Sequence, residues 1–376
     1  MSERRMRLAE PTFPEGTLER LGAVLATGNL TQGPVVAEFE EAVAEFIGVG
    51  HAVATTSATT AIELTLAALE IGPGDEVLAA DFTYPATGNA ALQRGADLRL
   101  VDVRKDTYTI DPDALVAAIT PRTKAVIAVD VFGLAADYGR IEPLLRDRDI
   151  PLVCDAACSL GGAIGDRRTG TFGTASCFSF HPRKSLTTGE GGMVTTADGA
   201  LAERMRRLRN HGTERDGWRA TFVEPGFNYR MSDLNAALGL SQVDEFGEVV
   251  ARRGALAGDL TRRIAGIPGI VPQAVPPTHL HPYQAYVVHC ESPLRRDDLV
   301  LALRARGVES TLGTYAMHTE PAFRQACGTE PGDLPVAASL AAGTLALPLH
   351  QGLGLEDLDH IAEVLDSVVR EQAQDV

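Results

Sequence analysis

The sequence has no long apolar run, few basic residues and no repeated segment. No stretch of the 376 residues approaches the roughly 20 consecutive apolar residues that a membrane-spanning helix requires. Lysine and arginine number 34 against 50 acidic residues, and a net charge of −16 argues against a nucleic-acid backbone as the partner. We find no internal repeat and no low-complexity tract. We therefore expect a protein that binds neither membranes nor nucleic acid.

Cysteine is scarce and shows no pairing pattern. The five cysteines are odd in number and scattered, and Cys154 and Cys158 have no neighbouring ligands to complete a zinc site. The first residues also lack the apolar core of a secretory signal peptide. Free thiols without such a signal favour a reducing compartment, so we expect a cytoplasmic protein.

Between residues 50 and 200, short apolar runs alternate with amphipathic segments. The predicted strands are 76–80, 98–103, 125–129, 151–155 and 175–180. The predicted helices are 58–71, 85–94, 111–119, 138–148 and 198–209. This alternation predicts an α/β fold with a largely parallel sheet between helices, with its chemistry at the ends of the strands.

The pattern changes near residue 245. A helix starting near Asp244 leads into proline-rich 268–283, and further strands (285–290, 308–312) and helices (295–306, 355–370) follow. At 45% apolar residues the chain is long enough for two cores. We predict an amino-terminal arm and large domain over 1–244 and a smaller α/β domain over 245–376.

The segment around Lys184 is the most informative. An apolar run with Ser179 inside it ends at Pro182, which cannot donate a ladder hydrogen bond, and a glycine-rich turn follows the lysine. Lys184 is thus predicted to lie on a tightly shaped loop between two strands. A covalent amine needs such a loop, because it must be held beside a carbonyl carbon in partly neutral form.

Two other segments carry groups that could bind a charged ligand: an aspartate and the amino terminus of a helix. Asp155 ends a predicted buried strand; alone it would more often be a helix cap or an ion-pair partner, but with the lysine motif downstream it could keep a pyridine nitrogen protonated. Ser57 is a predicted N-cap, and the free N–H groups of the next turn, with the Thr59 hydroxyl, could bind a phosphate. By itself this second segment would be simply a capped helix.

In combination, these segments resemble the DegT/DnrJ/EryC1/StrS aminotransferases, also called sugar aminotransferases. The resemblance extends over nearly the whole chain and includes the segments 28–34, 208–212, 226–231 and 345–349. It implies the type I fold of enzymes that depend on pyridoxal 5′-phosphate, with a large domain built on a mainly parallel, seven-stranded type of sheet. It also implies a homodimer whose active sites are completed across the interface.

The resemblance also assigns roles to single residues. Lys184 would carry the cofactor as a Schiff base, and Asp155 would pair with its ring nitrogen. Tyr84 would stack on the ring, and Asn228 would reach the phosphate in the neighbouring subunit, although a turn residue before an aromatic is an equal reading. The phosphate would be bound by residues from two segments: Ser57, Ala58, Thr59 and Ser179.

Two positions depart from the family pattern. Family members commonly have glycine at Ala58, so the backbone there must tolerate a β-carbon. Cys158 stands where glutamine or histidine usually lies near the phenolic oxygen of the cofactor, and a thiol is a weak hydrogen-bond partner. A small buried cysteine without any role is the simpler reading.

The implied function is transfer of an amino group from L-glutamate or L-glutamine to a nucleotide-linked 3- or 4-keto-6-deoxyhexose. Alternatives are a cyclitol or amino-hydroxybenzoate type of aminotransferase, a non-catalytic regulator with a cofactor pocket, and another type I activity such as decarboxylation. A lysine at position 184 disfavours the family's dehydratases, which have histidine there. Tyr315 and His318 are candidates for contacts with the acceptor.

Overall fold

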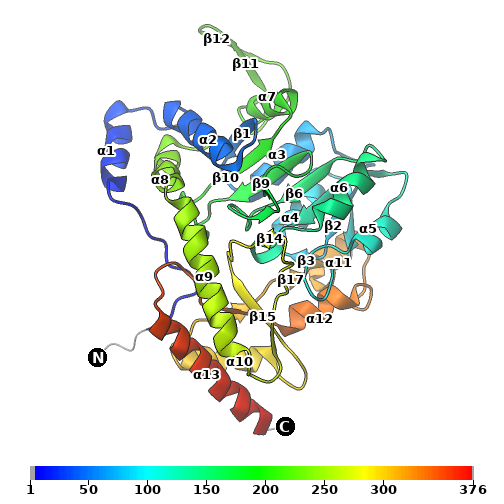
Figure 1. Cartoon of the computed structure of the whole chain (residues 1–376). Helices are drawn as coiled ribbons and strands as arrows, with labels where there is room; N and C mark the ends of the chain where they lie inside the picture. The colour runs from blue at the N-terminus through cyan, green and yellow to red at the C-terminus, as the bar shows by residue number, and fades with distance from the viewer. Residues whose placement is uncertain (1–4, 375–376) are drawn as a thin grey trace.

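The computed structural model describes residues 5–374 and is built around a seven-stranded sheet (Figure 1). The strands lie in the order β1-β10-β9-β6-β5-β2-β4. Their bounds are β1 His51–Thr55, β2 Glu76–Ala80, β4 Asp97–Val101, β5 Thr123–Val129, β6 Leu152–Asp155, β9 Ala175–Ser179 and β10 Gly192–Thr196. The five strands from β9 to β4 are parallel, and β10 is antiparallel to both of its neighbours. The predicted mainly parallel sheet is confirmed.

Both faces of this sheet are covered, as strand β2 shows. Val77 and Ala79 belong to one apolar cluster, whereas Leu78 and Ala80 belong to another. The first cluster contains α3 Ala58–Ala68, α4 Ala86–Gln93 and α7 Gly199–Leu208, and the second contains α5 Pro112–Ala118 and α6 Tyr138–Arg146. Continuous apolar strands are typical of parallel sheets that are buried on both sides.

A second, antiparallel sheet follows in the order β13-β15-β18-β16. Its strands are β13 Ile270–Pro272, β15 Tyr286–Cys290, β16 Thr311–Leu312 and β18 Thr344–Leu347. The helices α9 Phe246–Ile264, α10 Arg296–Ala305 and α13 Leu355–Gln374 share its apolar core (Figure 1). The strand predicted over 308–312 is shorter than expected, because Val308 instead forms an isolated bridge with Met6 of the amino-terminal segment. The division at 244/245 stays a prediction.

The remaining elements are short or were not expected. They are α1 Thr17–Thr27, α2 Pro34–Ile47, α8 Asp233–Val243, α11 Pro321–Cys327, α12 Pro335–Gly343, η1 Val131–Gly133, η2 Met317–Thr319, β3 Phe82–Thr83, β7 Ala163–Ile164, β8 Arg167–Arg168, β11 Thr213–Asp216, β12 Arg219–Phe222, β14 His279–Leu280 and β17 Tyr315–Ala316. Segment 213–225 contains the hairpin of β11 and β12, which projects from the body (Figure 1). No helix within residues 5–374 is long and apolar enough to cross a membrane.

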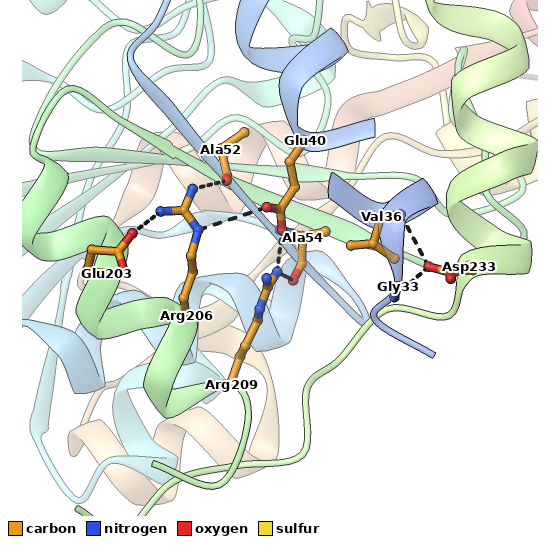
Figure 2. A network of polar contacts seen from close by, with 9 residues as sticks. All are labelled: Gly33, Val36, Glu40, Ala52, Ala54, Glu203, Arg206, Arg209 and Asp233. Atoms are coloured by element: carbon orange, nitrogen blue, oxygen red, sulfur yellow. Dashed lines mark hydrogen bonds and ion pairs between the residues drawn. The ribbon is translucent and has the colours of Figure 1, made fainter. Parts of the chain in front are cut away.

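Helix α2 is attached to the body by two buried carboxylates (Figure 2). Its N-cap residue, Gly33, has no side chain that could cap the helix. The carboxylate of Asp233 in α8 takes this part, because it accepts the N–H groups of Gly33 at 2.8 Å and Val36 at 3.2 Å. A β-carbon on Gly33 would lie 2.1 Å from Asp233 Oδ2, so a larger residue there would displace this carboxylate from the cap. The cap of α2 thus comes from a residue far away in the chain.

Glu40, on the same helix, forms a buried ion pair with Arg209 (Figure 2). Its carboxylate also accepts the N–H of Ala54 at 2.8 Å, and Arg209 donates to the carbonyl of Ala54 at 2.6 Å. The side chains are only 11% and 5% exposed. Arg206 lies farther away, at 4.0 Å from Glu40. The pair therefore joins α2 to the edge strand β1 and to the end of α7.

We expect Arg209→Met to lower the free energy of unfolding by about 3 kcal/mol or more, because it leaves a desolvated carboxylate with too few partners. Arg206→Met is the matched control, since Arg206 is 30% exposed and its contact with Glu40 is longer. Its cost should stay below about 1 kcal/mol. Urea unfolding at one fixed protein concentration measures both changes; equal costs would contradict this account of the pair.

Candidate active site

The predicted site residues meet at one edge of the central sheet. Strand β1 is antiparallel to β10, which is antiparallel to β9, so β1 runs in the same direction as β9 and β6. The carboxyl ends of these three strands therefore share an edge, and Ser57, Ser179 and Asp155 lie at or just beyond those ends. Open α/β sheets bind their ligands at this edge.

Lys184 lies on residues 180–192, here called the lysine loop. Its backbone N–H donates to the carbonyl of His181 at 2.8 Å, which closes a tight turn with Pro182 at its second position. At the base of the loop, Thr188 and Phe180 are joined by an N–H to carbonyl bond of 2.9 Å. The predicted turn and its proline are thus confirmed as local structure.

The side chain of Lys184 is half-buried and lies against the segment that follows β6. Its Nζ donates to Cys158 Sγ at 2.9 Å. The chain has three lysines in all, and the other two, Lys105 and Lys124, are exposed. In a sequence that otherwise uses arginine for its cations, this scarcity is an additional signal that singles out Lys184.

Asp155 is a buried carboxylate, 6% exposed. Burial raises its pKa, while hydrogen bonds from Thr87 and Ala157 and the charge of Lys184 act in the opposite direction. The Thr87 hydroxyl donates to Asp155 Oδ2 at 2.6 Å, and the Ala157 N–H reaches Oδ1 at 3.3 Å. Because the single proton of Thr87 is used in this way, Thr83 must donate in the 3.1 Å contact between the two threonine hydroxyls.

The first turn of α3 has the geometry of an anion site. Ser57 and Thr60 form a capping box, in which each side chain accepts the backbone N–H of the other residue. The N–H groups of Ala58 and Thr59 precede the helical hydrogen-bonding pattern and point out of its amino end. A β-carbon on Gly192 would lie 2.3 Å from Ser57 O, so glycine lets β10 approach this turn closely.

The other expected site residues lie outside this cluster of contacts. Tyr84 is 68% exposed, and its ring meets the ring of Tyr315 edge to face at 6.4 Å between centroids. Asn228 is exposed and forms an isolated bridge with Asn210. Ser179 is half-buried, with its hydroxyl 3.4 Å from the N–H of His181. Ser179 nevertheless lines the same small cavity as Lys184.

The interpretation of His318 as an acceptor contact is wrong. His318 is fully buried, and its Nδ1 lies 2.5 Å from Asp81 Oδ2. Its backbone N–H also binds Asp81, whose pKa burial raises to about 6, although the contacts with His318 lower it. Together with the pairing of β17 and β3, this contact holds the segment 315–319 against the end of β2. The sequence pattern could not distinguish this structural role from an exposed one.

The sequence analysis also missed three amides that bind the lysine loop. Gln284 binds Arg183 and Ser185, Gln242 binds Thr187, and Asn235 binds Thr188 and Glu190. Gln242 and Asn235 come from α8, and Gln284 precedes β15. Nothing in their local sequence marks them, because each acts on a backbone group far away in the chain.

A family model and two known proteins match most of the chain. The family model of the DegT/DnrJ/EryC1/StrS aminotransferase family matches residues 12–366. GDP-perosamine synthase of Caulobacter vibrioides is 37% identical over 340 residues, 90% of this chain and 91% of that protein. Spore coat polysaccharide biosynthesis protein SpsC of Bacillus subtilis is 33% identical over 373 residues, 96% of each chain.

A solved structure shows the same fold. The putative sugar aminotransferase Spr1654 from Streptococcus pneumoniae, in its PMP form, superposes with a TM-score of 0.93 at 28% identity and covers 98% of both chains. With a family model that spans almost the entire length and relatives above 30% identity, the chain belongs to the DegT/DnrJ/EryC1/StrS aminotransferase family of type I fold enzymes, and it is an aminotransferase.

Proposed function

We propose that this aminotransferase binds pyridoxal 5′-phosphate through Lys184 and transfers an amino group from L-glutamate or L-glutamine to a nucleotide-linked keto sugar. The observation that carries the proposal is the meeting of an amine and a buried carboxylate at one sheet edge. Lys184 and Asp155 come from different strand ends, and the charge of the lysine acts on the pKa of the aspartate. A helix amino terminus suited to a phosphate lies at the same edge.

The residues present fit this cofactor. Asp155 offers an ionisable carboxylate for the ring nitrogen, and Thr87 fixes one of its oxygens. Ala58 and Thr59 offer N–H groups for the phosphate, and the Thr59 and Ser179 hydroxyls can add to them. Tyr84, with most of its ring exposed, is available to stack on an aromatic ring. Ala58 keeps the backbone N–H that is used here, so its β-carbon is compatible with the role.

When bound, pyridoxal 5′-phosphate supplies an electron sink for the carbanion formed at the amino donor. Asp155 would hold the proton on the ring nitrogen, because a buried carboxylate strongly favours a cationic partner. Lys184, released from the cofactor, would move the proton at the donor's α-carbon as general base and acid. The Lys184 amine donates to Cys158 Sγ, and a thiol is a weak acceptor.

The acceptor is proposed from the family and from the nucleotide sugar in the name of one relative. A nucleotide diphosphate is anionic, and the chain carries a net charge of −16, so local cations are needed to bind it. Arg183 is exposed beside Lys184, and Arg230 is half-buried, with its guanidinium 2.8 Å from Asn210. These two arginines are the proposed contacts for the diphosphate.

We also propose that the enzyme acts as a homodimer with shared active sites. The β11–β12 hairpin projects from the body, and its Trp218 and Phe222 are 93% and 72% exposed (Figure 1). An isolated two-stranded hairpin is marginally stable in water, and large exposed aromatic side chains favour association. Asn228, close to the hairpin in sequence and exposed, is available to a second copy.

We expect Lys184→Ala to remove transamination and the colour of the bound cofactor, because within residues 5–374 Lys184 is the one lysine whose charge acts on Asp155. Lys105→Ala and Lys124→Ala are the matched controls, since both side chains are exposed. Borohydride reduction followed by peptide mapping should label Lys184 in the wild type and in both controls. A label on another lysine, or substantial turnover by Lys184→Ala, would refute the assignment.

The choice of acceptor is tested by charging the enzyme with amine from glutamate and then adding a panel of ketones. We expect nucleotide-linked keto sugars to restore the absorbance of the aldehyde form, and free keto cyclitols or aromatic precursors to leave it unchanged. Recovery with a cyclitol or an amino-hydroxybenzoate precursor alone would replace the proposed substrate by one of the family's other classes. A protein that accepts no amine from any donor would instead be a regulator.

Shared active sites predict complementation between two inactive variants. Lys184→Ala has lost its own amine but still supplies Asn228, and Asn228→Ala has the opposite defect. Mixing the two under subunit exchange should restore activity, because a hybrid dimer contains one complete site. Light scattering should give twice the 39.9 kDa of one chain. A monomer, or no recovery in hybrids shown to form, would contradict sharing.

A further inference from the structure

The two peptide groups that flank Lys184 are bound by one side chain, Gln284. Its Oε1 accepts the N–H of Ser185 at 2.9 Å and the Ser185 hydroxyl at 3.0 Å. Its Nε2 donates to the carbonyl of Arg183 at 2.7 Å. Gln284 thus uses both ends of its amide on the residues immediately before and after the lysine. It also lines a small cavity together with Lys184 and Cys158.

Gln284 is aimed at the lysine loop by an unusual turn. Tyr283, immediately before it, has a left-handed backbone with φ of 50°, which a side chain other than glycine adopts rarely. The Tyr283 N–H donates to His281 Nδ1 at 2.8 Å, and the two rings stack at 4.1 Å between centroids. These contacts fix the conformation of residues 281–284, here called the strap.

Arg253 of α9 binds the backbone of the strap. This arginine is 3% exposed. Its Nε donates to the carbonyl of Tyr283 at 3.1 Å, and its Nη2 donates to the carbonyl of Gln284 at 3.1 Å. Burial lowers its pKa to about 10 and also lowers that of His281, to about 3, so His281 is neutral and accepts at Nδ1. A buried cation that binds main-chain carbonyls fixes backbone position more strongly than a neutral donor would.

The other two amides act farther along the loop. Gln242 binds both backbone groups of Thr187, and Asn235 binds the carbonyls of Thr188 and Glu190. They fix the second half of the loop to α8. The first half, which carries the lysine, is bound by Gln284, which precedes β15. Removing Gln284 therefore frees the turn at Lys184 without detaching the loop.

We propose that Gln284 is a positioning residue for Lys184, held in place by Arg253 through the strap. The inference rests on the proposed function of Lys184. An amine that transfers a proton within a bound complex must be placed accurately, since a displacement of about 1 Å can cost on the order of 100-fold in rate. Gln284 supplies this placement through the backbone and takes no part in the chemistry itself.

The test is Gln284→Met in the holoenzyme, which keeps the length of the side chain and removes its hydrogen bonds. We expect kcat to fall on the order of 10- to 100-fold with the KM for glutamate nearly unchanged, because the amine is misplaced while the binding groups remain. Amide hydrogen exchange in a peptide covering 181–188 should become faster. The absorbance pKa of the lysine-bound cofactor should also shift.

Gln372→Met is the matched control. Gln372 makes the same two-sided contact with the backbone of Arg295, accepting its N–H at 2.7 Å and donating to its carbonyl at 3.2 Å. This variant should lose a similar amount of stability and leave kcat, the absorbance pKa and exchange in 181–188 unchanged. Should Gln284→Met fail to fold, Ser185→Ala removes one of the three bonds and should shift all three readouts in the same direction by a smaller amount.

The outcomes separate this inference from the proposed function. A wild type that takes up no cofactor, or that is not trapped at Lys184 by borohydride, refutes the function. A wild type that is trapped at Lys184, with Gln284→Met keeping kcat within twofold and the same exchange rates, refutes only the positioning role. Equal effects in Gln284→Met and Gln372→Met would also refute it, because the loss would then reflect general stability.

Discussion

The candidate active site depends on one almost completely buried carboxylate, that of Asp155. Asp155 lies at the end of the central strand β6; burial raises its pKa, and hydrogen bonds from Thr87 and Ala157 and the charge of Lys184 act in the opposite direction. One neutral hydroxyl at 2.6 Å and a long amide contact do not replace the hydration of a carboxylate. The remaining lone pairs favour a cationic partner, and a protonated ring nitrogen fits that requirement.

Segments next to the second sheet also contribute to this site. The strap before β15 binds the lysine loop through Gln284, and the segment 315–319 after β16 is bound to the end of β2 through His318 and Asp81. In both cases a buried charged group, Arg253 or Asp81, fixes backbone near the site. Burying such groups is costly unless each is fully hydrogen-bonded, so these two contacts also specify how the carboxy-terminal elements pack against the central sheet.

The sequence predicts those parts whose cause is local. The strands β2, β5, β6 and β9 and the helices between them follow from apolar periodicity, and Pro182 with the later glycines predicts the turn at Lys184. The parts that depend on distant partners could not be predicted. The sequence around Gly33 does not indicate that Asp233 caps its helix. The buried position of His318 depends on its contact with Asp81, and only the fold brings these two residues together.

Segment 213–225 is a different case, because its residues form a hairpin without a core of its own. Strands β11 and β12 have mostly exposed side chains, so neither alternation nor burial marks them in one chain. The hairpin must therefore be stabilised either by its own turn or by contacts with a second copy of the chain. Asn228 is also exposed in the single chain, and the role proposed for it requires a second copy.

The choice of Cys158 as the partner of Lys184 is consistent with the loop around it. A carboxylate there would fix the position of the amine strongly, but it would also stabilise the ammonium form, which can neither attack a carbonyl nor accept a proton. A thiol is a weak acceptor and contributes little to the position of the amine. The position must then be defined through the backbone, and the lysine loop has this support from three amides, on both sides of the lysine. The weak contact of the Lys184 side chain and the tight binding of its peptide groups thus belong together, because the backbone supplies the placement that the thiol does not.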